Sequence, residues 1–142
     1  MGDSTVKLEL IDGKAMLSGT ARTNPEIIID YSPPVGTGKG YNSLELFLMS
    51  FASCVGTTLV AALRRKLNKS INGISIEAEG KAREEHPKGL ENILLKLHIK
   101  AKELSETEVR ETLKALEDKL CPVWAMIKGN VTVTVEVEIS DT

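Results

Sequence analysis

The sequence predicts an α+β fold in which antiparallel or mixed sheets pack against helices. Segments of alternating apolar and polar residues predict strands, and two segments that begin with capping residues predict helices. Consecutive strands joined by short turns predict hairpins, with the helices covering one face of the sheet. The expected order is βββ–α–ββ–α–β, and 142 residues suit a single domain over 1–142.

Three short strands are expected before the first helix. Residues 6–10 alternate with period two, and residues 14–20 form the hairpin partner through the turn dipeptide Asp12-Gly13. Residues 26–31 form the third strand. The segment 32–41 is a loop, because its proline and glycine residues prevent regular structure.

The first helix is expected from Asn42 to about Lys66. Asn42 can cap it, with Glu45 three residues later as in a capping box. The basic residues 64–66 suit the negative end of the helix dipole. Residues 44–63 are mostly apolar and about long enough to span a membrane, but they contain Glu45 and several Ser, Thr and Gly residues. We therefore expect a buried helix, apolar on nearly all sides, rather than a membrane anchor.

The second half of the chain predicts a hairpin, a helix and a final strand. Alternating residues in 74–79 and 93–99 form the hairpin around a turn at 86–90. Ser105 and Glu108 form a second capping box. The helix behind it carries one apolar stripe of Val109, Leu113, Leu116 and Leu120.

Proline ends that helix. The residue before a proline is disfavoured in helical dihedrals, so the helix breaks at Cys121-Pro122. A short helix follows at 122–127. The clearest strand of the chain comes last, at 131–139, where valine and isoleucine alternate with threonine and glutamate.

Composition excludes several classes of function. A net charge of −2 and few aromatic residues argue against nucleic-acid binding. The N-terminus lacks the pattern of a signal peptide, so a cytoplasmic protein is expected. His86 and His98 stand with the cysteines in no zinc-binding spacing. The run from Gly36 to Gly40 lacks the Ser or Thr that a P-loop needs after its lysine, so a flexible connector is expected there.

Two cysteines, Cys54 and Cys121, are the only ones in the chain. In an apolar helix Cys54 can simply be a core residue. Cys121 stands at the start of a short helix, where N–H groups and the dipole favour a thiolate. Local physics therefore predicts that Cys121 is the more reactive sulfur. A reactive Cys54 would need a cation or hydrogen-bond donor from elsewhere, and the pair can be inert, bridged or redox-active.

The segment from Gly40 to Cys54 resembles the central-helix signature of the OsmC/Ohr family. In that family a Gly-x-x-Pro-x-Glu-Leu run is followed by small and apolar residues and then by a cysteine. The second cysteine, before a helix that leads into the last strand, matches Cys121-Pro-Val. The resemblance covers nearly the whole chain. It implies an OsmC-like fold around a long central apolar helix that carries Cys54, in an intertwined homodimer.

The resemblance also implies a chemistry, the thiol-dependent reduction of hydroperoxides, organic ones especially. Cys54 would be the peroxidatic thiol and form a sulfenic acid, and Cys121 would resolve it as a disulfide. An external dithiol would reset the pair, and no bound cofactor is expected. The alternatives are a redox-sensing or thiol-exchange protein and a non-catalytic binder of a small apolar ligand.

The chain departs from the family pattern at two catalytic positions. Leu44 stands where the well-studied peroxidases carry a glutamate, and Glu45 comes one residue later, which resembles the less characterised YhfA-like branch. A shift of one residue rotates a helical side chain by about 100°. The family also uses an arginine from the N-terminal region, and Arg22 is the candidate here. Lys39 could supply the charge but not a bidentate guanidinium.

Overall fold

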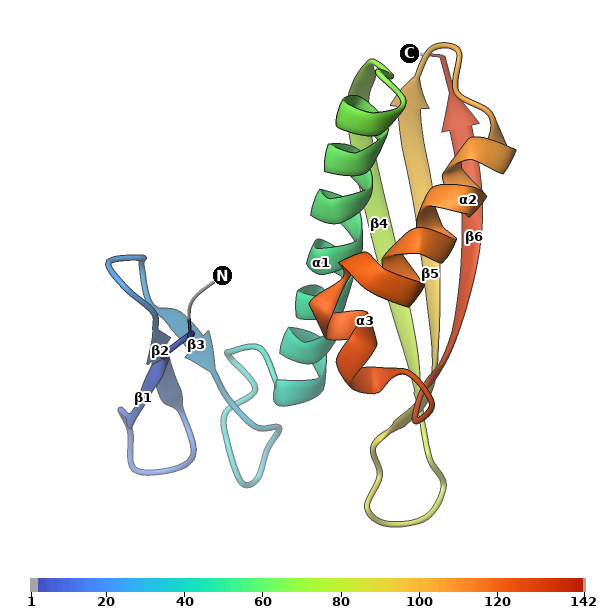
Figure 1. The fold of residues 1–142 in the computed structure, drawn as a ribbon. Coiled ribbons are helices and arrows are strands. Elements are labelled where there is room, and N and C mark those ends of the chain that lie inside the picture. The colour runs from blue at the N-terminus through green and yellow to red at the C-terminus, as the bar shows by residue number, and fades with distance from the viewer. Residues whose placement is uncertain (1–2, 142) are drawn as a thin grey trace. The chain divides into compact units, whose positions relative to one another are not determined.

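The chain divides into two compact units, Met1–Phe47 and Leu48–Thr142, in a computed structural model that describes residues 3–141. The first unit contains an antiparallel sheet in the order β1-β2-β3 (Figure 1). Its strands are β1 (Lys7–Leu10), β2 (Leu17–Thr20) and β3 (Ile27–Ile29). The three predicted strands are present, each shorter than expected.

The turn between β1 and β2 is longer than a two-residue hairpin loop because Asp12 organises it. The Asp12 carboxylate accepts hydrogen bonds from the backbone N–H groups of Lys14 and Met16, at 2.9 and 3.0 Å. Residues up to Met16 therefore belong to the turn. β2 begins at Leu17 rather than at Lys14.

The loop after β3 folds around a buried carboxylate. Asp30 accepts hydrogen bonds from the Thr37 hydroxyl and from the backbone N–H groups of Tyr31, Thr37 and Lys39. The Thr37 hydroxyl contributes most to holding the pKa of Asp30 below its usual range. A side chain at Gly36 would collide with the Tyr31 carbonyl oxygen and with Asp30. The expected flexible connector is therefore an organised loop, whose N–H groups bind Asp30 instead of a phosphate.

The second unit contains a mixed sheet in the order β4-β5-β6. β4 (Ile71–Ala82) and β5 (Leu90–Ala101) form the predicted antiparallel hairpin. β6 (Thr132–Ser140) pairs with β5 in parallel. A parallel pair needs a crossover connection, and the helical segment between β5 and β6 provides it.

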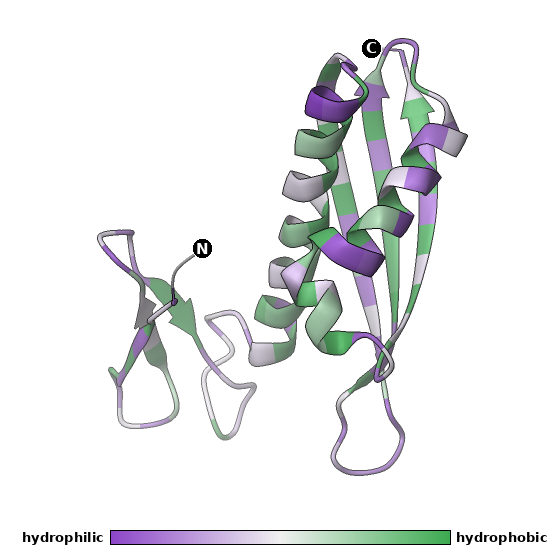
Figure 2. Ribbon diagram, viewed as in Figure 1, coloured by the Kyte–Doolittle hydropathy of each residue, from purple (hydrophilic) through white to green (hydrophobic). Residues whose placement is uncertain are grey.

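Helices cover one face of this sheet (Figure 1). They are α1 (Ser43–Lys66), which begins in the first unit, α2 (Glu106–Ala115), a π-helical turn η1 (Leu116–Leu120) and α3 (Pro122–Ile127). Apolar and polar residues alternate along strand β5 (Figure 2). Its alternate apolar residues are all buried: Ile93, Leu95, Leu97, Ile99 and Ala101.

The polar face of the sheet carries His98. Its side chain is half-buried, and its Nε2 lies 3.1 Å from the Ser140 hydroxyl of β6. The parallel pairing places His98 beside Glu138 and next to Ser140. His98 is therefore held within the sheet surface by its cross-strand neighbours.

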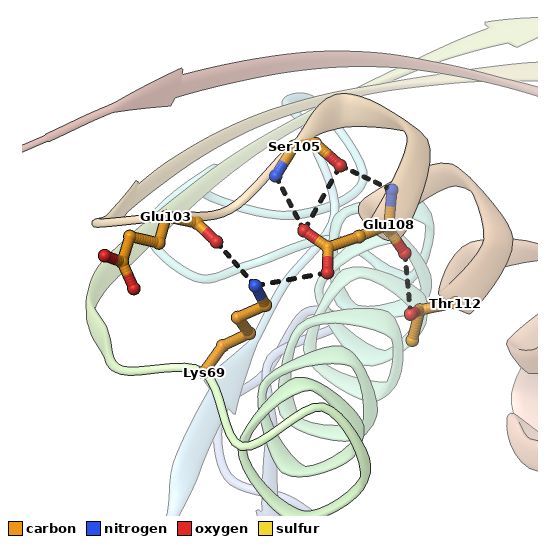
Figure 3. A network of polar contacts seen from close by, with 5 residues as sticks. All are labelled: Lys69, Glu103, Ser105, Glu108 and Thr112. Atoms are coloured by element: carbon orange, nitrogen blue, oxygen red, sulfur yellow. Dashed lines mark hydrogen bonds and ion pairs between the residues drawn. The ribbon is translucent and has the colours of Figure 1, made fainter.

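The second capping box also links α2 to the end of α1 (Figure 3). Ser105 accepts from the Glu108 N–H at 3.1 Å, and the Glu108 carboxylate accepts from the Ser105 N–H at 3.0 Å. The other Glu108 oxygen lies 3.2 Å from the Lys69 ammonium. Lys69 also donates to the Glu103 carbonyl oxygen at 2.6 Å. The loop after α1 is thus attached to the first turn of α2.

The last turn before Cys121 is wider than an α-helical turn. The Cys121 N–H donates to the Leu116 carbonyl oxygen at 2.9 Å, which closes the π-turn η1. Successive residues of such a turn rotate by less than the roughly 100° of an α-helix. The predicted apolar stripe therefore ends at the buried Leu116, and Leu120 is 37% exposed.

Helix α1 is long and apolar enough to cross a membrane, judged by length and composition alone. The core helix of a soluble protein has the same character. Only 28% of its most apolar stretch is buried within this chain. The helix is therefore apolar over a wider surface than its own unit encloses.

Candidate functional site

Two thiols from different elements meet in the second unit. Cys54 lies in α1, and Cys121 is the residue that caps the start of α3. The Cys121 thiol donates to the Cys54 sulfur, with the Sγ atoms 2.8 Å apart, and both cysteines are free. Sulfur atoms in a disulfide are about 2.05 Å apart. A bond between these two sulfurs therefore needs them to approach by less than about 1 Å.

An aromatic contact holds the two thiol-bearing segments together. Phe51 precedes Cys54 by one helical turn, and Trp124 follows Cys121 by one turn, so each ring shares a helix face with its cysteine. The two rings meet edge to face, with centroids 5.5 Å apart and an interplanar angle of 85°. Both rings are buried. Close packing of these rings restricts how far the two sulfurs can separate.

Burial disfavours a thiolate at Cys121, in contrast to the expectation from local sequence. The start of α3 does provide a helix N-terminus, and the Trp124 N–H lies 3.5 Å from the Cys121 sulfur. However, the Cys121 side chain is only 2% exposed. Burial, followed by the contact with Cys54, raises the pKa of the Cys121 thiol to about 11. The cost of desolvating the Cys121 thiolate is therefore larger than the stabilisation that the N-terminus of α3 provides.

This difference predicts the order of alkylation. With a pKa of about 11, the Cys121 thiol at pH 8 is ionised in about one molecule in a thousand. Cys54 is half-buried rather than buried, so iodoacetamide at pH 8 should label Cys54 first. Peptide mass spectrometry of a time course measures the order. Equal or faster labelling of Cys121 would contradict it, and labelling of both cysteines in urea is the control.

The other predicted catalytic residues lie in the first unit. Glu45 forms the predicted capping box, since its carboxylate accepts from the Asn42 N–H at 2.9 Å and its own N–H donates to Asn42 at 2.8 Å. Glu45 and Lys39 line one surface cavity of about 550 Å³ together with Glu26. Arg22 is an exposed residue in the turn between β2 and β3, with a φ of 57°. It does not line that cavity.

The arrangement of Cys54 and Cys121 suits thiol oxidation more directly than metal binding. A buried, protonated Cys121 donates its hydrogen to the Cys54 sulfur, which leaves the half-buried Cys54 as the acceptor. Any oxidised form of Cys54 would have a second thiol within bonding reach. Among residues 3–141, no group of three or more His, Cys, Asp and Glu side chains is placed to hold a metal ion.

Sequence reasoning missed the role of Phe51 and Trp124. The available signal was their spacing, because each cysteine has an aromatic residue three positions away on the same helix. When two such segments pack together, their aromatic rings and their sulfur atoms can be in contact at the same time. The π-turn that precedes Cys121 had no comparable signal in the sequence.

Comparison with known proteins identifies relatives over almost the whole chain. The family model described as "OsmC-like protein" matches residues 36–136. No curated protein matches the chain. A hypothetical protein from Aquifex aeolicus VF5 has a similar solved structure, with 30% identity, coverage of 99% of this chain and 98% of that chain, and a TM-score of 0.83.

Two further solved structures share the fold at lower identity. An OsmC-like protein from Mycoplasma pneumoniae is 21% identical, with 97% of each chain covered and a TM-score of 0.81. The organic hydroperoxide resistance protein OhrB of Bacillus subtilis is 23% identical, with coverage of 96% of this chain and 98% of that chain and a TM-score of 0.67. The α+β fold predicted from the sequence is confirmed by these likenesses.

Proposed function

Because the chain belongs to the OsmC-like protein family, we propose that it is a thiol-dependent hydroperoxide reductase acting on organic hydroperoxides. The observation that supports this function most directly is the contact of two free thiols, with the Sγ atoms of Cys54 and Cys121 2.8 Å apart. The fold is also that of a Bacillus subtilis protein named for organic hydroperoxide resistance. A peroxidatic thiol beside a resolving thiol is an arrangement suited to this reduction, because the sulfenic acid can condense at once with the second thiol.

The reaction has two steps on the enzyme. The Cys54 sulfur attacks the terminal peroxide oxygen, the O–O bond breaks, and the alcohol leaves with a proton, which gives a Cys54 sulfenic acid. The Cys121 sulfur then attacks the Cys54 sulfur and displaces the oxygen as water, with formation of a Cys54–Cys121 disulfide. The half-burial of Cys54 and the burial of Cys121 suit this order of roles.

The cycle needs two electrons from outside the protein. An external dithiol would attack the disulfide, form a mixed disulfide and leave both cysteines reduced. Both electrons pass through sulfur, so the proposal includes no bound cofactor. A cytoplasmic location suits it, because thiols are kept reduced there.

Glu45 and Arg22 remain the proposed auxiliary residues. A carboxylate and a guanidinium together could orient the thiolate and the peroxide, as the resemblance to the peroxidases implies. In this chain the Glu45 carboxylate is engaged by the helix cap, so capping is its first role. The assignment to the YhfA-like branch stays a prediction, since it rests on Glu45 following Leu44.

A homodimer is the second part of the proposal. Between residues 3 and 47 only Asp30 and Gly36 are buried, so the first unit encloses almost no apolar core of its own. Its exposed apolar side chains include Val6, Leu8 and Leu10. Less than a third of the apolar stretch of α1 is buried. A second copy of the chain would remove these surfaces from water.

One experiment tests the proposed reaction. The reduced protein is treated with a slight excess of cumene hydroperoxide, quenched, and its cysteines are mapped by mass spectrometry. Rapid formation of a Cys54–Cys121 disulfide, with one alcohol released per disulfide, is expected. If both thiols remain free after long exposure, the protein is not a hydroperoxide reductase. Slow oxidation that requires a large excess of peroxide favours the redox-sensing alternative.

A groove between α1 and β4 favours the alternative of a ligand-binding protein. It has a volume of about 570 Å³, within the range typical of small-molecule sites. Apolar groups form much of it, and Arg64 and Arg65 provide positive charge that suits an anionic head group. Its lining residues are Ser53, Gly56, Thr57, Val60, Ala61, Arg64, Arg65, Ile74 and Ile76. Native mass spectrometry of the purified protein would reveal a retained ligand.

A further inference from the structure

Cys121 lies within a short, closed segment of chain. Its N–H donates to the Leu116 carbonyl oxygen at 2.9 Å and closes η1, while its own carbonyl oxygen accepts from the Ala125 N–H at 3.0 Å and begins α3. Helix α3 ends one turn later, where the Lys128 N–H donates to the Trp124 carbonyl oxygen at 2.9 Å. The sulfur is therefore positioned by the angle between η1 and α3.

Side chains at the two ends of this segment are joined by charge. The Lys128 ammonium, just after α3, lies 3.2 Å from the Asp118 carboxylate and 3.7 Å from the Glu117 carboxylate, both in η1. Lys114 of α2 lies 3.2 Å from the same Asp118 oxygen. We call Lys128, Glu117 and Asp118 the η1 clamp. It connects the end of α3 back to the turn that precedes Cys121.

The clamp lies at the surface, where Lys128 contacts both carboxylates and Lys114 contacts Asp118 as well. Removal of the Lys128 charge would leave Asp118 its contact with Lys114 but break the contacts of both carboxylates with the end of α3. A single exposed ion pair contributes little to stability. An ion pair that fixes the angle between two short elements can still control the direction of a side chain that lies between them. Among residues 3–141, the contacts of Lys128 are the only ion pairs that link η1 to the end of α3.

We propose that Lys128 is a positioning residue, which holds the Cys121 sulfur in bonding reach of Cys54 through the η1 clamp. This inference rests on the proposed function, because positioning matters when Cys121 must attack an oxidised Cys54. The step it serves is the second one, in which the S–S bond forms, the S–O bond of the sulfenic acid breaks, and water leaves. Attack of Cys54 on the peroxide does not depend on it.

Removal of the Lys128 charge should affect only the step in which the Cys54–Cys121 disulfide forms. Lys128→Met should slow formation of the Cys54–Cys121 disulfide by about twofold to fivefold, and the longer-lived sulfenic acid should be overoxidised to sulfinic acid more often. Lys128→Arg keeps the charge and should restore the rate. In a Cys121→Ser background, Lys128→Met should leave the rate of Cys54 oxidation unchanged.

Lys69→Met is the matched control. It also removes a lysine that lies 3.2 Å from a glutamate (Figure 3). That glutamate, Glu108, is in the first turn of α2, whereas Cys121 follows η1 beyond the other end of the helix. Lys69→Met should lower stability at least as much as Lys128→Met and leave disulfide closure unchanged. Unfolding in urea for both variants separates a loss of stability from a loss of positioning.

The measurement is a rapid-quench time course of thiols, sulfenic acid and disulfide by mass spectrometry after addition of cumene hydroperoxide. A second series uses diamide, which oxidises two thiols to a disulfide and is itself reduced to the hydrazine, so closure is measured without any peroxide. Slower closure by Lys128→Met in the diamide series supports positioning even if the wild type ignores hydroperoxide. Closure at the wild-type rate, or equal slowing by Lys69→Met, would overturn the proposal.

Discussion

Cys54→Ser should abolish hydroperoxide consumption, with a loss of more than about a thousandfold in kcat/KM, because it removes the covalent nucleophile and leaves only the buried Cys121 thiol, whose raised pKa disfavours attack on a peroxide. Serine has nearly the shape of cysteine, so the fold around Phe51 and Trp124 should be retained. Dithiol-dependent consumption of cumene hydroperoxide measures the loss. Retention of more than a few per cent of activity would remove Cys54 from the proposed role.

Cys121→Ser is the matched variant and should fail at a different step. It should consume one equivalent of hydroperoxide, form a Cys54 sulfenic acid that dimedone traps, and then turn over slowly or not at all. The two variants therefore separate attack from resolution. If Cys121→Ser loses the first step and Cys54→Ser keeps it, the assignment of roles is reversed.

Secondary structure could be predicted well where local sequence determines it. The two capping boxes, at Asn42 and Ser105, depend on side chains three residues apart and are present as expected. The break at Cys121-Pro122 and the short helix after it follow from the restrictions that proline imposes. Turn lengths were less accurate, because one side chain, Asp12, extends the first hairpin loop through two backbone contacts.

The burial of Cys121, which raises the pKa of its thiol, could not be predicted from local sequence. The sequence places Cys121 at a helix N-terminus, and that terminus is present. What the sequence does not contain is the packing of α1 against α3, which removes Cys121 from water and brings Cys54 to it. Tertiary burial here opposes the thiolate at Cys121 that the helix terminus alone would favour.

The η1 clamp and the π-turn likewise could not be predicted from the local sequence. The residues Val109, Leu113, Leu116 and Leu120 fit an α-helical period throughout, whereas in the structure the Cys121 N–H bonds to the Leu116 carbonyl oxygen, five residues back. A wider turn before a site residue is a common form of local adjustment at functional sites. Here the π-turn η1 directly precedes Cys121, whose side chain is buried.

Trp124→Ala should have the largest effect on stability. Trp124 is 6% exposed and Phe51 fully buried, so truncation leaves a cavity beneath α3 and should cost about 3–5 kcal/mol of unfolding free energy. The loss should also release α3 from α1 and slow formation of the Cys54–Cys121 disulfide. Unfolding in urea gives the free energy, at one protein concentration throughout, because association with a second copy would raise the apparent stability.

A double-mutant cycle with Phe51→Ala separates the ring contact from simple burial. If the edge-to-face pair is a specific contact, the double variant should lose about 0.5–1.5 kcal/mol less than the sum of the two single variants. Trp124→Phe keeps an aromatic edge against Phe51 and should recover most of the disulfide rate. Strictly additive costs, or normal disulfide formation in Trp124→Ala, would show that the rings fill space without holding the sulfurs together. In that case the position of Cys121 would depend on η1 and its charged contacts rather than on the aromatic pair.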